Sequence, residues 1–242
     1  MNTMKNIKTK SLILLLILFS NLHADVAVFP EKEWQSRMPD SVGIESEKVE
    51  YLFDLAFQDQ ATQSAVLIKN GYIIKERYSE SFDQESYGTS WSMAKSFYAA
   101  LIGISIDRGE INSLDDKVSD YVDYYNDERS EITIRQILNM TSGLDFPENE
   151  HESMFFRHDQ IAYVKDVGVE KLPEKLFEYN NVNSMIVGEI LKNATGISAE
   201  ILLEDRIFKP IGIDKFTLWK DGTGNPMTYC CIDMSARDYS RF

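Results

Sequence analysis

Residues 91–107 of the chain read WSMAKSFYAALIGISID, and their apolar side chains recur at helical spacing. This pattern predicts a long, mostly buried helix over Ser92–Asp107, which Gly109 would end. Ser92 and Lys95 are three positions apart, so a helix places both side chains on one face. There the amine can accept or hold the hydroxyl proton, an arrangement typical of an activated nucleophile.

The first turn of this helix suits such chemistry. With Thr89 or Ser90 as the cap, Ser92 would lie where backbone N–H groups are unpaired, and its own N–H would help to hold an oxyanion. Partial desolvation would lower the pKa of Lys95 toward that of a useful base. Alternatively, Ser92 only begins the helix and Lys95 extends to solvent.

A second candidate is Tyr179-Asn180-Asn181, directly before a predicted helix over Val182–Asn193. A phenol and an amide two residues apart in an extended segment point to the same side, where they would relay a proton and orient a neighbour. The same spacing in Tyr124-Tyr125-Asn126 is interpreted as surface. The sequence contains no G-x-S-x-G, H-E-x-x-H or C-x-x-C motif, which would indicate other routes to hydrolysis or metal binding.

Local patterns predict the remaining organisation. Two β-rich runs flank Asn70-Gly71 and predict a hairpin of Ser64–Lys69 with Tyr72–Tyr78. The acidic, aromatic stretch Asp145–Lys171 lacks periodicity and predicts a long surface excursion. No strands are predicted that would complete a sheet with the hairpin. Further helices are expected over Glu45–Phe57, Thr133–Met140 and Ser198–Phe208.

The charge and the metal-binding residue types exclude several functions. Twenty-five basic against thirty-nine acidic residues give a net charge of −14, which would repel a nucleic-acid backbone. His151 and His158 lack the spacing of a helical zinc pair, so neither a metal nor a cofactor is expected. Cys230 and Cys231 are adjacent, which would strain a bridge between them, so they are predicted to be buried thiols.

Residues 1–24 have the pattern of a secretory signal peptide. Lysines precede the apolar run Leu12–Phe19, and Ala24 follows it. The run is short for a membrane span, although a retained anchor is the alternative. We therefore expect residues 25–242 to form one exported domain, periplasmic or secreted, without stable membrane insertion after signal removal.

Many segments, taken in order, resemble the penicillin-recognising serine hydrolases of the class C β-lactamase-related superfamily, and most of all its 6-aminohexanoate-dimer hydrolase and esterase branch. The resemblance begins near Ser64 and extends to Phe242. The matching segments are Trp91–Phe97, Ser113–Asp116, Val118–Tyr121, Thr133–Asp145, Tyr179–Asn181, Gly188, Ala194–Gly196, Pro210–Gly212, Cys230-Cys231 and Ala236–Phe242.

The resemblance implies an α/β (α+β) fold of the β-lactamase/transpeptidase type, with an antiparallel sheet flanked by helices and a helical subdomain. It implies that Ser92 is the acylated nucleophile and Lys95 its proton acceptor. Tyr179 would carry the proton to the leaving group, and Asn181 would orient the lysine or the substrate amide. The implied activity is hydrolysis of a small-molecule amide or ester through an acyl-enzyme, with no cofactor.

One expected motif is missing. The family closes its site with K-T-G or an H-x-G-like variant on a later strand, whereas Lys220-Asp221-Gly222 is predicted to be a turn. The chain stops at Phe242 within a helical pattern, so we expect the domain and its C-terminal strands to continue beyond it; a helix that simply ends there is the alternative. A non-catalytic cell-envelope binding module and an inactive fragment therefore stay open as alternatives, as do the individual substrate and the oligomeric state.

Overall fold

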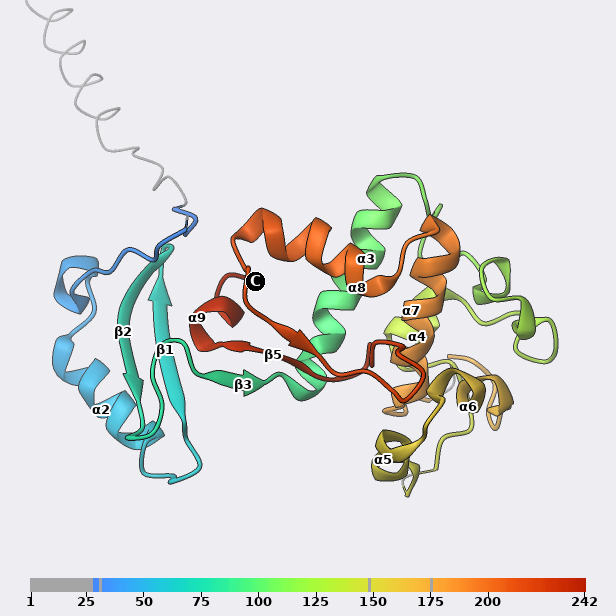
Figure 1. The fold of residues 1–242 in the computed structure, drawn as a ribbon, viewed down its shortest axis with the longest axis horizontal. Helices are drawn as coiled ribbons and strands as arrows, with labels where there is room; N and C mark the ends of the chain where they lie inside the picture. The colour runs from blue at the N-terminus through green and yellow to red at the C-terminus, as the bar shows by residue number, and fades with distance from the viewer. Residues whose placement is uncertain (1–27, 31, 148, 175) are drawn as a thin grey trace, which may run out of the picture.

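The computed structural model describes residues 28–30, 32–147, 149–174 and 176–242 (Figure 1). The predicted signal peptide, residues 1–24, lies outside these ranges. In the described ranges, no helix combines the length and the apolar character that crossing a membrane requires. The molecule is elongated in Figure 1, with a hairpin at one end and a helical body at the other.

The predicted hairpin is confirmed at its predicted bounds. Strands β1 (Ser64–Lys69) and β2 (Tyr72–Tyr78) pair antiparallel. Asn70 and Gly71 form the turn with φ angles of 53° and 79°, the left-handed values that a tight hairpin turn requires. Helix α2 (Ser46–Ala56) lies beside the hairpin in Figure 1.

A second, three-stranded sheet joins segments far apart in the chain. Its antiparallel order is β3 (Tyr87–Thr89), β5 (Ile232–Ser235) and β4 (Thr217–Leu218). In the described part of the chain none of these strands joins the hairpin, which stays two-stranded as predicted, but the second sheet itself was not predicted. These strands are two to four residues long, too short to show a period-2 pattern, and they form only by long-range pairing.

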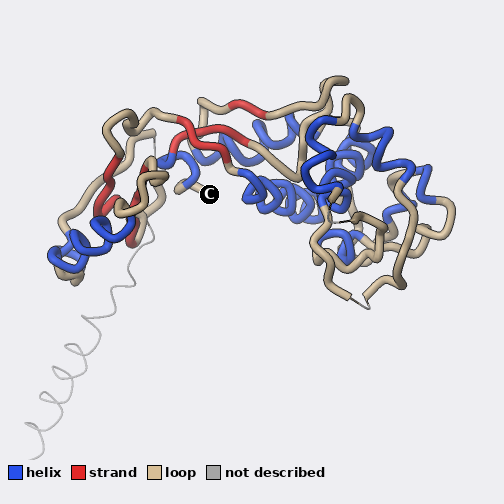
Figure 2. The backbone as a smooth tube through the Cα atoms, turned by 90° about the horizontal axis from the view of Figure 1, so that it is seen from below, coloured by secondary structure: helices blue, strands red, loops and turns tan. Residues whose placement is uncertain are grey.

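The helical body surrounds α3 (Ala94–Asp107), which packs against α7 (Asn181–Thr195) and α8 (Ala199–Leu203). α3 is mainly apolar, and buried side chains along its length contribute to the core. Gly196 ends α7 in the left-handed conformation, as the sequence predicted. Figure 2 shows the strands at the left end and along the upper middle of the molecule, and most of the helices at the right end.

The segment Asp145–Lys171 is more ordered than a surface excursion. It contains α5 (Glu150–Ser153) and α6 (Gln160–Asp166). It also buries Met154 and Val164 in the core. The expectation of an irregular loop was wrong because these helices are too short to show a clear period, and their stability comes from burial rather than from pattern.

Two further expectations need correction. Tyr124 is half-buried rather than on the surface, and its hydroxyl donates a hydrogen bond to Glu189 of α7. Cys230 and Cys231 are buried as predicted, but they form a disulfide between neighbours instead of two thiols. The Tyr124 contact comes from long-range packing, which the local sequence does not report.

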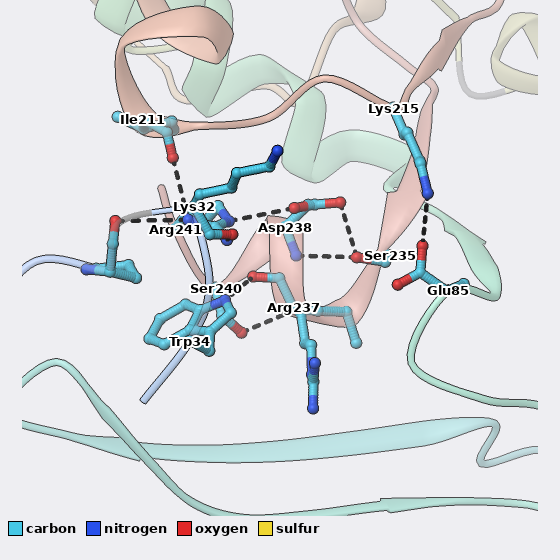
Figure 3. A network of polar contacts seen from close by, with 12 residues as sticks. Lys32, Trp34, Glu85, Ile211, Lys215, Ser235, Arg237, Asp238, Ser240 and Arg241 are labelled. Carbon is cyan, nitrogen blue, oxygen red and sulfur yellow. Dashed lines mark hydrogen bonds and ion pairs between the residues drawn. The ribbon is translucent and has the colours of Figure 1, made fainter. Parts of the chain in front are cut away.

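A polar network ties the hairpin to the body (Figure 3). The short helix α9 (Ala236–Tyr239) follows β5, and its Arg237 forms an ion pair with Glu76 of β2. The indole of Trp34 donates to the Arg237 carbonyl at 3.2 Å. Arg241 donates to the Ile211 carbonyl at 3.4 Å, which connects α9 to the helical body.

The other described helical elements are short. Helix α4 (Ile134–Leu138) begins at Thr133, whose hydroxyl accepts from the Gln136 N–H. The remaining turns are the 3-10 segments η1 (Pro39–Val42), η2 (Trp91–Met93), η3 (Val118–Asp120), η4 (Asp123–Tyr125), η5 (Met154–Phe156) and η7 (Lys209–Ile211), and the π-helical η6 (Glu204–Phe208).

Candidate active site

Ser92 lies at the junction between β3 and α3. The α-helix begins two residues later than predicted, and Ser92 occupies the preceding 3-10 turn. Neither expected cap serves as one: Thr89 donates to Asp233, and the Ser90 hydroxyl accepts from the Ile232 N–H at 2.9 Å. Both side chains instead form hydrogen bonds with β5, and these bonds fix the position of Ser92.

The residue before Ser92 has an unusual backbone. Trp91 adopts a φ of 45°, in the left-handed region that side chains other than glycine rarely enter. Such a conformation costs on the order of 1–3 kcal/mol and is held only when the surrounding structure enforces it. Here it turns the chain sharply from β3 into α3 and leaves Ser92 exposed.

Lys95 reaches the Ser92 hydroxyl from the first turn of α3. Its Nζ lies 3.1 Å from Ser92 Oγ, 3.0 Å from Asn181 Oδ1 and 2.8 Å from the Tyr229 carbonyl oxygen. A neutral amine has two N–H donors and one lone pair. The Asn181 and Tyr229 oxygens can take the two donors, which leaves the lone pair for the Ser92 hydroxyl proton.

Burial lowers the pKa of Lys95 below its ordinary value of 10.5, because desolvation disfavours the charged ammonium. The neighbouring Tyr179 opposes this effect without reversing it. Its ring also lies beneath the amine, with Nζ 4.9 Å from the ring centroid. The environment therefore moves Lys95 toward the neutral form that a proton acceptor needs.

Tyr179 approaches Ser92 from the segment before α7. Its hydroxyl donates to Ser92 Oγ at 2.6 Å, a short O–H···O hydrogen bond. Asn180 caps α7 by accepting from the Val182 N–H at 2.8 Å, and its buried amide donates to the Leu144 carbonyl. This cap fixes Tyr179 and Asn181 on either side of it, and both contact the same site.

The Tyr229 carbonyl is held in place by close packing on α7. The Thr228 hydroxyl donates to the Ser184 carbonyl at 2.6 Å. A Cβ at Gly188 would lie only 3.0 Å from the Thr228 side chain, so a glycine lets the segment approach the helix. Sequence reasoning missed this partner of Lys95, because a main-chain carbonyl gives no side-chain signal.

His151 of α5 is a second residue that sequence reasoning missed at the site. Its Nδ1 lies 3.5 Å from the amide nitrogen of Asn181, and its ring centroid lies 5.9 Å from that of Tyr179. The ring packs edge-on against Phe146 at 4.8 Å. From the sequence, this histidine was weighed only as a metal ligand. Across residues 28–242, outside the three undescribed positions, no cluster of side chains suits a metal ion.

All four predicted site residues thus meet at one place. Ser92 and Lys95 come from the start of α3, whereas Tyr179 and Asn181 come from the start of α7. The hydroxyl, the amine and the phenol are joined by direct hydrogen bonds, the arrangement of a nucleophile with adjacent proton-transfer groups. The catalytic roles of these residues stay predictions.

Comparisons with known proteins define the class. The family model described as Beta-lactamase matches residues 58–229, more than half of the chain. The chain therefore belongs to the beta-lactamase family, a family of serine hydrolases, and has a beta-lactamase/transpeptidase-like fold of helices and antiparallel strands. The predicted fold class is confirmed.

Individual relatives agree with this assignment. Penicillin-binding protein 4 of Amycolatopsis lactamdurans is 30% identical over 135 residues, which are 53% of this chain and 35% of that protein. A structure from Bacillus anthracis, assigned as a 6-aminohexanoate-dimer hydrolase, superposes with a TM-score of 0.69 at 21% identity over 90% of this chain and 62% of that one. One from Bacteroides dorei, assigned as a beta-lactamase, gives 0.67 at 22% identity over 82% and 62%. The match thus spans about a third of the curated relative's length.

Proposed function

We propose that this chain carries the acylation site of an exported serine hydrolase that cleaves a small-molecule amide or ester through an acyl-enzyme on Ser92. The observation that carries the proposal is the direct contact of Ser92 Oγ with both Tyr179 and Lys95, at 2.6 and 3.1 Å. A serine hydroxyl is a weak nucleophile until a neighbouring base takes its proton. Two such neighbours are within hydrogen-bond reach.

Acylation would begin from neutral Lys95. As Ser92 Oγ forms a bond to the substrate carbonyl carbon, its proton moves to Nζ, and the carbonyl oxygen takes the electron pair. When this tetrahedral intermediate collapses, the bond to the leaving group breaks and the leaving group takes the Tyr179 proton. Lys95 then returns a proton to Tyr179, so the charges balance and the acyl-enzyme remains.

Hydrolysis would reverse these roles. A water molecule attacks the ester carbon on Ser92 and passes its proton to the Tyr179–Lys95 pair, and Ser92 Oγ regains a proton as it leaves. Asn181 and the Tyr229 carbonyl hold Lys95 in place throughout, through contacts of 3.0 and 2.8 Å. The amide nitrogen of Asn181 faces His151, whose Nδ1 lies 3.5 Å away.

The proposed substrate is a small-molecule amide or ester rather than a polyanion, because the chain carries a net charge of −14. Export rests on the signal-like pattern of residues 1–24. The names of the relatives include penicillin-binding proteins and a 6-aminohexanoate-dimer hydrolase, which fit cleavage of amide bonds.

Labelling with a fluorophosphonate tests the proposal. Ser92 Oγ would form a bond to phosphorus, fluoride would leave, and Lys95 would take the hydroxyl proton. Ser96 offers a matched control: it lies four residues further along the chain, in α3, and is exposed. The proposal predicts labelling of the parent and of Ser96→Ala but not of Ser92→Ala. A folded parent chain that takes up no label would instead favour a non-catalytic binding module.

A further inference from the structure

A cavity of about 430 Å³ opens beside the nucleophile. Its lining residues are mostly aromatic and come from η2, α5, η5 and the segment around β4: Trp91, Glu152, Phe155, Phe156, Trp219 and Met227. Trp91 directly precedes Ser92 in the chain. One lining residue of the cavity is therefore the immediate chain neighbour of the proposed nucleophile.

Aromatic contacts connect this cavity to the catalytic groups. The Trp91 ring lies 6.2 Å from Phe155 and 6.4 Å from Trp219. Phe155 in turn packs edge-on against Tyr229 at 5.2 Å. Tyr229 also supplies the carbonyl that accepts from Lys95, so ring contacts link the cavity wall to the proposed base.

The lining is unusually apolar for an exposed surface on so acidic a chain. Phe156 is 88% exposed and Trp91 is 60% exposed, yet both face a shared hollow. Large aromatic side chains left uncovered next to a reactive group indicate a binding surface rather than random exposure. Glu152 is the single charged residue of the lining. Two other cavities of about 440 Å³ contain neither Trp91 nor Phe155, the two lining residues that connect the cavity beside the nucleophile to Ser92 and Tyr229.

We propose that this cavity, here called the aromatic cavity, binds a bulky apolar group of the substrate and rejects groups that carry a negative charge. This inference rests on the proposed function, because it assigns the substrate class of the same site. The aromatic faces supply stacking and apolar burial. The Glu152 carboxylate supplies repulsion toward anions and favours neutral or cationic groups.

Boronic acids test the substrate class, because each carries one organic group on a boron that accepts the Ser92 oxygen. Methylboronic acid, phenylboronic acid and 4-carboxyphenylboronic acid differ only in that group. Competition against fluorophosphonate labelling gives the dissociation constant of each. We expect phenylboronic acid to bind about tenfold tighter than methylboronic acid, and the carboxylate to remove most of that gain.

Three variants locate the effect. Phe156→Ala removes an almost fully exposed ring, so its fold should persist, and it should reduce the phenyl-to-methyl preference about fivefold. Trp219→Ala should act in the same direction, although its indole also donates to Asp233 at 2.9 Å. The matched control Phe29→Ala, at a residue that is 80% exposed and outside the cavity lining, should leave the preference unchanged.

Glu152→Gln tests the charge. This variant should bring 4-carboxyphenylboronic acid close to phenylboronic acid and leave the phenyl-to-methyl preference intact. Equal binding of the phenyl and methyl probes to a chain that fluorophosphonate labels would overturn the aromatic cavity and leave the proposed function standing. A chain that neither boronic acids nor fluorophosphonate modify would overturn both.

Discussion

The Tyr179 hydroxyl lies 2.6 Å from the Ser92 hydroxyl, although 87 positions separate the two residues. The contact requires that α3 and α7 both begin at the same place, and the packing of these two helices in the core provides this. Lys95 then completes the group from the first turn of α3, 3.1 Å from the same oxygen. The site is thus built where two buried helices start side by side.

The pH dependence of acylation should report Lys95. Its pKa is lowered from 10.5 by burial, so the neutral amine becomes available at a lower pH than for a solvated lysine. The value of kcat/KM for p-nitrophenyl acetate should rise with pH and level off below 10.5. A profile that still rises in proportion to hydroxide beyond that pH would contradict the role of Lys95.

Asn181→Asp should shift this profile to higher pH. The new carboxylate would replace the amide oxygen that lies 3.0 Å from Lys95 Nζ, and a negative charge there stabilises the ammonium form. We expect the rise in kcat/KM to move about one pH unit higher and activity near neutral pH to fall about tenfold. An unshifted profile would show that Asn181 does not set the protonation of Lys95.

Tyr179→Phe removes only the hydroxyl oxygen and keeps the ring beside Lys95. Because that hydroxyl is the proposed proton donor to the leaving group, kcat should fall about 10²- to 10⁴-fold for an amide substrate. The loss should be smaller for p-nitrophenyl acetate, whose leaving group needs no proton. Equal losses on both substrates would argue for a purely structural role of the hydroxyl.

Glu189 should make the folded protein less stable as pH rises. Burial raises its pKa above 4.5, while the hydrogen bond from Tyr124 partly lowers it. The folded state therefore binds a proton more tightly than the unfolded state, and stability falls as pH rises through the interval above 4.5. Urea unfolding should show this fall for the parent, a flatter curve for Glu189→Gln, and a steeper one for Tyr124→Phe.

Much of the fold was predictable from the residue types at turns and at helix ends. Asn70-Gly71 fixed the hairpin, because few turns other than a tight one accept two consecutive left-handed residues. The end of α7 was equally readable from Gly196. By contrast, β5 has only four residues, too few to show a period-2 pattern. Its partner β3 lies more than a hundred residues earlier in the chain and its partner β4 about fifteen residues earlier, so the local sequence did not predict the strand.

The residues of the site also fall into those that the sequence predicted and those that it did not. Ser92 and Lys95 were identifiable together because helical spacing links them, and Tyr179 and Asn181 joined them only through the family resemblance. The Tyr229 carbonyl and His151 were not identifiable. The first is a backbone group placed by the packing of Thr228 on Gly188, and the second reaches the site from a segment that sequence reasoning treated as irregular.

Mass spectrometry of a trapped acyl-enzyme tests the central claim most directly. Trypsin cuts after Arg77, Lys95 and Arg108, so Ser92 and Ser96 fall on different peptides, residues 78–95 and 96–108. After reaction with a slowly hydrolysed ester, we expect the acyl mass on peptide 78–95, with fragmentation placing it on Ser92, and no acyl mass on this peptide in Ser92→Ala. An acyl group on any other residue, or the same yield in Ser92→Ala, would contradict the central claim.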